Sequence, residues 1–371
     1  MSYDIMNSLI DDLSNTLENQ GDGTEVLIDE KFENMELTRE NFQEIKPDNK
    51  IRKAAYVDGG NVELLGAPNY SIQLNRTYFS IFRGRERFIP KTLQPRNEFL
   101  SYVVSKIINS NGKRNLIYET KLFPFHKKDL ESLPKEKHLM ISSMDRTITT
   151  GNRRADISRT MSIARRFAEW ALAKRVLESE LSENDVIVMD GSLQEAFKYE
   201  QNYTTPLYEN AKKKGVTICG LSKTSLLFTN SGASLLGTIQ KLSRDIKFGK
   251  WFYKIHTSTK DPRGIIFVVK LHQNSNHIYR FEVLKEQFDK MSDDDFNNLL
   301  NSLCANSTDL AMPGYPYGLI DADTFARVKF NEISYYRDLA LADISRNKKW
   351  KEILGHRTTM RVHDDLNSVV G

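Results

Sequence analysis

The sequence predicts an α/β protein built on a mixed β-sheet that is flanked by helices. Two stretches of different pattern lead to this class. Residues 53–82 are rich in β-branched and aromatic residues and predict a strand meander, whereas helix and strand patterns alternate from residue 157 onward. A meander followed by alternating elements is typical of a mixed sheet with helices packed on it. At 371 residues and 39% hydrophobic content, the chain can bury a large core.

Residues 1–50 form an acidic leader for which we expect helical structure. Apolar residues at helical spacing predict an amphipathic helix over residues 3–19. They are Ile5, Leu9, Ile10, Leu13 and Leu17. After the break NQGDGTE, a second acidic helical stretch is expected to about residue 45. Packing on the body, pairing with another chain and docking of a partner all remain open as roles for this leader.

The next hundred residues begin as strands. KAAYVD (53–58) predicts a buried strand, and SIQLNRTYFSIF (71–82) alternates as a strand does. NEFLSYVVSKIINS (97–110) is interpreted as a helix, and NLIYET (115–120) as a strand. The meander therefore begins with the strand that ends in Asp58.

A long helix and several buried strands make up the second half. One face of the helix carries Ile157, Met161, Ala164, Ala168, Ala171 and Leu172. The strand VIVMD then delivers Asp190 at its end. Further elements are a helix in 203–215, strands in 216–223, 264–272 and 277–283, and helices over 285–304 and 318–344.

The charge of the chain is unevenly divided. The net charge is +4, but residues 1–50 hold 13 acidic and 4 basic residues, so the leader carries −9 and the rest +13. Basic residues interleaved with aromatic ones favour a polyphosphate partner such as nucleic acid, because cations release counterions and rings stack on bases. A solvated basic face without a ligand is the alternative. The DNA-binding candidates are Arg76, Arg83, Arg85, Arg87, Arg165 and Arg166.

Several classes of protein are disfavoured. Cys219 and Cys304 are too few for a disulfide framework or a cysteine zinc site, and we expect both to be buried. No apolar run reaches 18 residues, and the N-terminus lacks the order of a signal peptide. We therefore expect a cytoplasmic protein that does not enter the membrane.

Two strands end in an Asp-Gly step, YVDGGN (56–61) and VMDGSL (188–193). If these strands are neighbours, Asp58 and Asp190 converge at the rim of the sheet, and hard carboxylate oxygens suit Mg²⁺ or Mn²⁺. Metal-dependent hydrolysis of phosphodiesters needs further acidic ligands. Glu169, at the border of the buried face of the long helix, is a candidate third ligand. Each Asp-Gly step alone is equally compatible with a simple turn.

Together with GLSKTS (220–225) and PGYPYGLIDADTFARV (313–328), these two steps resemble the NurA nucleases over roughly residues 50–330. The resemblance implies a ribonuclease H-like fold and a metal-dependent deoxyribonuclease of the 5′–3′ exonuclease and single-strand endonuclease type. It also implies Mn²⁺ or Mg²⁺ as cofactor, a homodimer, and a HerA-type hexameric ATPase as partner in DNA end resection. The expected layout is a leader (1–50), a nuclease domain (51–335) and a basic C-terminal tail (336–371).

The resemblance also implies roles for single residues. Asp58, Glu169, Asp190 and Asp323 match the metal-binding positions, although family members often carry His where this chain has Asp323. Lys223 matches the lysine-bearing strand end and is a candidate for binding phosphate, for which an ammonium is suited. Tyr315 is expected either to line the DNA channel or to close its turn by packing.

Two other functions stay open. A catalytically silent DNA-binding or scaffold subunit needs no metal site. An actin-like phosphotransferase also uses Asp-Gly turns, but DGGNVELLG is a poor phosphate-binding hairpin. In the tail, His356 and His363 are equally suited to phosphate contact and to solvation.

Overall fold

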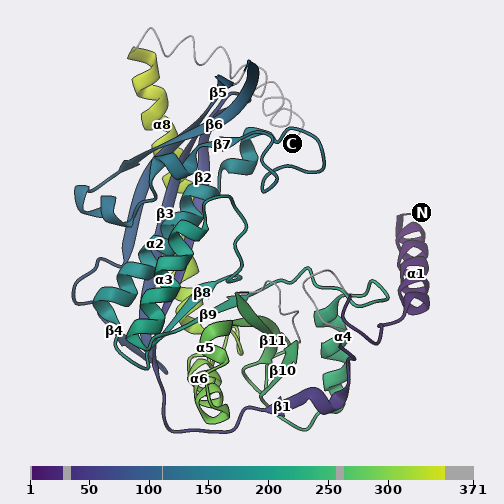
Figure 1. Cartoon of the computed structure of the whole chain (residues 1–371). Coiled ribbons are helices and arrows are strands. Elements are labelled where there is room, and N and C mark those ends of the chain that lie inside the picture. The colour runs from purple at the N-terminus through teal and green to yellow at the C-terminus, as the bar shows by residue number, and fades with distance from the viewer. Residues whose placement is uncertain (1, 28–34, 111, 256–262, 347–371) are drawn as a thin grey trace.

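A computed structural model describes residues 2–27, 35–110, 112–255 and 263–346. Within this part of the chain, one 12-stranded sheet runs through the molecule (Figure 1) in the order β1-β10-β11-β12-β9-β8-β2-β3-β5-β6-β7, with β4 paired to β3. The expected mixed sheet flanked by helices is confirmed. The strands are β1 (Phe42–Glu44), β2 (Lys53–Ala67), β3 (Tyr70–Arg83), β4 (Glu86–Phe88), β5 (Arg96–Ser110), β6 (Lys113–Pro124), β7 (Ile141–Ser142), β8 (Val186–Asp190), β9 (Thr217–Ser222), β10 (Trp251–Ile255), β11 (Gly264–Lys270) and β12 (Tyr279–Leu284).

The centre of the sheet has the expected ribonuclease H-like topology. Strands β2, β3 and β5 form an antiparallel unit. The chain then passes through helix α2 (Ile163–Glu180) to β8 and β9, and β8 pairs parallel to both β2 and β9. β2 and β8 run in the same direction, and their pairing extends to Val57 and Met189, so Asp58 lies beside the carboxyl end of β8. The strand end predicted at Asp58 is wrong, because β2 continues to Ala67 and Asp58 is only its sixth residue.

Alternation along β2 divides the core into two layers. Ala54 and Tyr56 face a cluster that contains side chains of α6 and α7, whereas Ala55 and Val57 face α2 and α3. The helices α2 and α3 therefore cover one face of the sheet, here called the α2 face, and α6 and α7 cover the other, the α7 face. Besides α2, the helices are α1 (Ser2–Gln20), α3 (Gln201–Lys214), α4 (Leu235–Leu242), α5 (Lys285–Phe288), α6 (Asp293–Asn306), α7 (Tyr317–Ala326) and α8 (Phe330–Arg346).

The helix predicted over residues 97–110 is wrong, because these residues form the long strand β5. Along β5 the side chains of Phe99, Ser101 and Val103 are buried, and those between them are partly exposed. Ser101 occupies an inward position because its hydroxyl accepts a hydrogen bond from Asn75 on β3. Because Ser101 is polar but buried, the sequence of β5 does not show the alternation of apolar and polar residues that predicts a strand.

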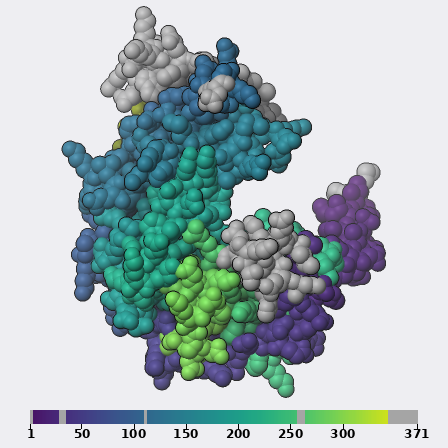
Figure 2. Space-filling model, viewed as in Figure 1, coloured from purple at the N-terminus to yellow at the C-terminus, as the bar shows by residue number. Residues whose placement is uncertain are grey.

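Among the described residues of the acidic leader, α1 is the α-helix, and Arg39–Asn41 form a 3₁₀ turn. Helix α1 confirms the first prediction, but the second helical stretch is wrong where it is described, since residues 42–44 form β1 and pair with β10. Residues 35–45 pack on the body: Met35, Leu37 and Phe42 share a buried cluster with α4 and β10. Helix α1 instead projects from the molecule (Figure 2), and its apolar residues are half exposed or more.

The C-terminal helix α8 crosses the expected boundary at residue 336, and the predicted helix over 318–344 is broken at residues 327–329. Arg76 of β3 holds the start of α8, because its guanidinium pairs with Glu332 at 2.8 Å. The predictions on His356 and His363 concern residues 347–371, which lie outside the described residues. No described helix has the length and apolarity that crossing a membrane requires.

Candidate metal centre

The two aspartates of the Asp-Gly steps lie side by side on the α7 face. β8 ends at Asp190, and its pairing with β2 ends at Val57, the residue before Asp58. Both aspartates have the same parity as the residues that face α6 and α7, because side chains alternate along a strand. The prediction that these strands are neighbours is therefore confirmed.

A third carboxylate joins them from α7. One oxygen each of Asp58, Asp190 and Asp323 lies within 4.8 Å of the others, and these are the residues that could hold a metal ion in the described part of the chain. Asp323 is the seventh residue of α7 and lies in its second turn. It is held by Arg327, one turn later, at 2.5 Å. The sequence analysis missed Arg327, although its i,i+4 spacing from Asp323 is the signal for such a pair.

Lys223 lies among these carboxylates, directly after β9. Its Nζ is 3.0 Å from Asp190 Oδ2 and 3.5 Å from Asp323 Oδ1. The ammonium also lies 5.4 Å from the ring centre of Tyr315. Lys223 thus bridges two of the three acids, while Arg327 pairs with Asp323 alone.

Tyr315 is buried and contributes to the wall of the site. Its ring packs on Tyr279, with ring centres 5.1 Å apart, and its hydroxyl lies 3.4 Å from Asp190 Oδ1. Burial, together with the charge of Asp190, raises the pKa of Tyr315 far above its usual value. Of the two expected roles, packing of the turn matches this placement, and the hydroxyl is directed at a carboxylate of the site.

Gly59 and Gly60 explain why the first aspartate precedes two glycines. A Cβ atom on Gly59 would lie 2.4 Å from Glu169 Oε1, and one on Gly60 would lie 2.5 Å from the carbonyl oxygen of Ala326. Both distances are shorter than any ordinary contact. The missing side chains therefore let α2 approach one face of β2 and the end of α7 approach the other.

Glu169 reaches the same strand from the α2 face. It is almost fully buried, and its carboxylate is ion-paired with Arg165, whose guanidinium also donates to the carbonyl oxygen of Gly59 at 3.2 Å. Burial raises the pKa of Glu169, and Arg165 opposes that rise. Glu169 is thus adjacent to Asp58 but is not one of the three converging carboxylates.

The electrostatics of the site favour a bound cation. Asp58 is 8% exposed. Burial, then the negative charges of Asp190 and Glu169, raises the pKa of Asp58 to about 8. A divalent cation would relieve this repulsion, and carboxylate oxygens are the ligands that Mg²⁺ and Mn²⁺ prefer. The donor set therefore fits a divalent metal.

The predicted DNA-binding arginines differ in exposure. Arg83, Arg85 and Arg87 lie exposed around the β3–β4 turn, and Arg87 is ion-paired with Asp321 of α7. Arg76 is 2% exposed, and its guanidinium donates to Glu98 at 2.5 Å as well as to Glu332. Buried and paired in this way, Arg76 holds β5 and α8 together and does not offer a free cation to DNA.

Arg165 and Arg166 of α2 are also engaged within the protein. Arg165 pairs with Glu169, whereas Arg166 pairs with Glu200 at 2.6 Å. Glu200 is fully buried and was not singled out from the sequence. A lone glutamate at the start of a helix carries no signal that it faces an arginine 34 residues earlier.

Two solved structures are distantly similar to this chain. The structure is similar to the crystal structure of A. aeolicus Argonaute, with a TM-score of 0.33 and 10% identity over 75% of this chain. It is also similar to Aa-Ago with externally bound siRNA, with a TM-score of 0.25 and 9% identity over 76% of this chain. The chain spans only 28% and 26% of those two chains, and the likenesses are too distant to carry an argument.

A comparison with curated proteins gave no significant match. The family model of the NurA domain, in contrast, matches residues 53–328. This range includes the two Asp-Gly strands, Lys223, Asp323 and the whole of α7. Because the match covers well over half of the sequence, the chain belongs to the NurA family.

Proposed function

We propose that this chain is a divalent-metal-dependent deoxyribonuclease. The observation that carries the proposal is the convergence of Asp58, Asp190 and Asp323, from two strands and a helix, within 4.8 Å of one another. Membership of the NurA family supports hydrolysis of DNA as the reaction. Mn²⁺ or Mg²⁺ is the proposed cofactor, because the three donors are carboxylates.

The residues of the site have separate roles in this proposal. Asp58, Asp190 and Asp323 would hold the metal, which when bound stabilises the charge that develops on the phosphodiester. Lys223 lies within 3.5 Å of both Asp190 and Asp323, and can pair with a phosphate oxygen of DNA. Tyr315 orients Asp190 through its hydroxyl. Glu169 stays the fourth proposed ligand, from the α2 face.

The surroundings suit a nucleic-acid substrate. Arg83, Arg85 and Arg87 are exposed near α7, and we propose that they contact phosphates of the DNA. We further propose 5′–3′ exonuclease and single-strand endonuclease activity in end resection, carried out in the cytoplasm by a homodimer with a HerA-type hexameric ATPase. These finer proposals depend on the family resemblance.

Degradation of end-labelled single- and double-stranded DNA tests the proposal. Wild-type protein should cleave with Mn²⁺ or Mg²⁺ and be inactive in EDTA, whereas Asp190→Ala should be inactive throughout. Asp289→Asn, which changes an exposed carboxylate at the end of α5, is the matched control and should retain full activity. Tight DNA binding without cleavage, also after addition of the ATPase, would favour a silent scaffold subunit.

A further inference from the structure

The loop that follows Asp190 is held by two glutamates that are fully buried. This loop, residues 191–200, connects β8 to α3 and is here called the post-Asp190 loop. Glu200 and Glu282 are both 0% exposed. Burying a carboxylate is costly unless it is paired and hydrogen-bonded, so the bonds of these two residues indicate what their burial achieves.

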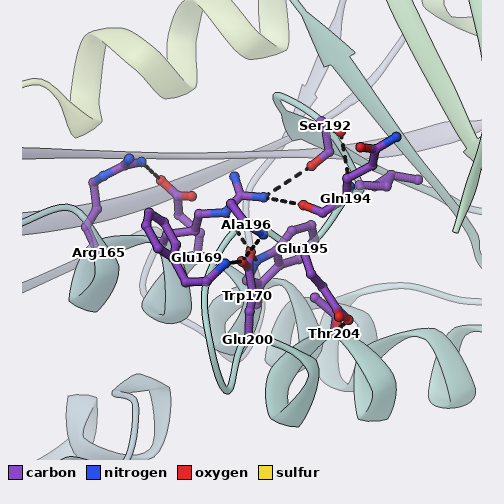
Figure 3. Close-up of polar contacts among 12 residues, drawn as sticks. Arg165, Glu169, Trp170, Ser192, Gln194, Glu195, Ala196, Glu200 and Thr204 are labelled. Atoms are coloured by element: carbon purple, nitrogen blue, oxygen red, sulfur yellow. Dashed lines mark hydrogen bonds and ion pairs between the residues drawn. The ribbon is translucent and has the colours of Figure 1, made fainter. Parts of the chain in front are cut away.

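Glu200 ties the end of the loop to α2. Its Oε1 accepts hydrogen bonds from Arg166 Nε at 2.6 Å and from Trp170 Nε1 at 2.7 Å. Its Oε2 accepts from the backbone of Ala196 at 2.7 Å and of Phe197 at 3.0 Å. Figure 3 shows the contacts of Trp170 and Ala196 converging on Glu200. The carboxylate therefore fixes the loop and orients the guanidinium of Arg166.

Arg166 uses one of its two terminal nitrogens on the backbone close to Asp190. Nη2 donates to the carbonyl oxygens of Ser192 at 3.4 Å and Gln194 at 2.9 Å. Figure 3 labels these two acceptor residues. The carbonyl oxygen between them, that of Leu193, accepts from the hydroxyl of Tyr208 at 3.0 Å. Three successive carbonyl groups are thus held by side chains of α2 and α3.

Glu282 of β12 also holds this stretch. Its Oε2 accepts from the backbone of Leu193 at 3.1 Å and from the hydroxyl of Ser192 at 3.2 Å. Its other oxygen is ion-paired with Arg280 at 2.8 Å. The two residues after Gly191 are therefore fixed by partners on α2, α3 and β12 together.

Neighbouring arginines of α2 thereby reach the backbone just beyond each aspartate. Arg165 donates to the carbonyl oxygen of Gly59, the residue after Asp58. Arg166 donates to that of Ser192, two residues after Asp190. One turn of one helix therefore contacts the backbone beside both carboxylates, and each of these two arginines pairs with a glutamate.

We propose that Arg166, held by Glu200, is a positioning residue that fixes the post-Asp190 loop and, through it, the place of the Asp190 carboxylate in the metal centre. This inference rests on the proposed function for the metal, but the order of the loop is independent of it. The Nε and Nη2 atoms of Arg166 both donate to groups within the protein. The positioning role therefore replaces the expectation that Arg166 binds DNA.

The test compares Arg166→Lys and Glu200→Gln with Arg175→Lys. Arg175 lies on the same helix but contacts Ser132 and Glu131, so it is a matched control for loss of a guanidinium. Lysine cannot reproduce the fork that binds Glu200 and two carbonyl oxygens. Three quantities are measured for each variant: Mn²⁺ affinity by calorimetry, hydrogen exchange of the loop amides without metal, and DNA affinity in EDTA.

We expect Arg166→Lys and Glu200→Gln to lower Mn²⁺ affinity about 10–100-fold, the usual cost of removing a partner of a metal ligand. The amides of Leu193, Ala196 and Phe197 should exchange about tenfold faster, because hydrogen bonds to a charged group protect them. DNA affinity in EDTA should stay as in wild type, and Arg175→Lys should change none of the three quantities.

Other outcomes separate the possible errors. Weaker DNA binding with unchanged Mn²⁺ affinity and unchanged exchange would overturn the positioning role and restore Arg166 as a DNA contact. If wild-type protein bound no Mn²⁺ at all, the proposed function would fail. The exchange of the loop amides would still show whether Arg166 and Glu200 fix the post-Asp190 loop. Where Arg166→Lys does not fold, Trp170→Phe removes one bond to Glu200 and is measured in its place.

Discussion

The two faces of the sheet differ in how their charged side chains are paired around Asp58 and Asp190. On the α7 face, three carboxylates are gathered around a single described lysine. On the α2 face, Arg165 and Arg166 are each matched to one buried glutamate. An excess of negative charge creates a place for a cation, whereas matched pairs fix structure. In the metal-free protein, carboxylates thus repel one another on one face and are neutralised in pairs on the other.

The largest effect is expected on the α2 face. Glu200→Ala leaves the guanidinium of Arg166 buried without its partner, and the free energy of unfolding should fall by about 3–5 kcal/mol. In metal-free protein, Asp58→Asn on the α7 face should leave the free energy of unfolding unchanged or higher, because it removes a carboxylate that repels its neighbours. Denaturant titration measures both. Equal losses in the two variants would erase the distinction between the faces.

The lysine of the α7 face gives the next largest effect. Lys223→Met should slow DNA cleavage about 10²-fold, the scale seen when one charge-stabilising group is removed from an active site. Its Mn²⁺ affinity should not fall, because the ammonium competes with a metal for Asp190 and Asp323. Single-turnover cleavage and calorimetry measure the two quantities. Loss of Mn²⁺ binding together with activity would count against this division of roles.

Metal affinity should depend on pH through Asp58. In the metal-free protein this carboxyl has a pKa of about 8, so it is protonated below that pH and a metal must displace its proton. Affinity for Mn²⁺ should therefore rise with pH, by up to about tenfold per pH unit between pH 6 and 8, and level off above. Calorimetry at these pH values measures it. Asp58→Asn should bind more weakly with a flatter profile, and an identical slope would implicate another group.

The smallest effect concerns Asp323, where the family resemblance leads us to expect histidine. Asp323→His should keep cleavage within about tenfold of wild type and shift the preference from Mg²⁺ toward Mn²⁺, because imidazole suits the softer metal. Rates with each metal at saturation give the ratio. A complete loss of activity would mean that the Lys223 and Arg327 pairs of Asp323 matter more than its part in metal binding.

Strand periodicity in the sequence predicted two of the three carboxylates of the site. Asp58 and Asp190 end apolar runs, and side-chain alternation places both on one face once the strands are neighbours. The same rule shows why Glu169 stands apart, since its contact Gly59 has the opposite parity to Asp58. The strand order that makes the rule applicable came from the family resemblance.

Long-range partners could not be predicted in this way. Arg76 alternates correctly into the sheet, but its partner Glu332 lies 256 residues away and has no local signal. The same holds for Ser101, whose bond to Asn75 makes a polar residue fit a buried position of β5. β1 is a strand only because β10 pairs with it. Each of these assignments depends on tertiary contacts that override local pattern.

The two glycines after Asp58 limit which substitutions are tolerated at positions 59 and 60. Any other residue at position 59 or 60 adds at least one carbon atom, and that carbon would collide with Glu169 on one side or with the backbone of Ala326 on the other. A side chain at position 60 would have to displace backbone, whereas one at position 59 would require the carboxylate of Glu169 to move. The close approach of α2 and α7 to opposite faces of β2 therefore depends on two residues whose side chains are single hydrogen atoms.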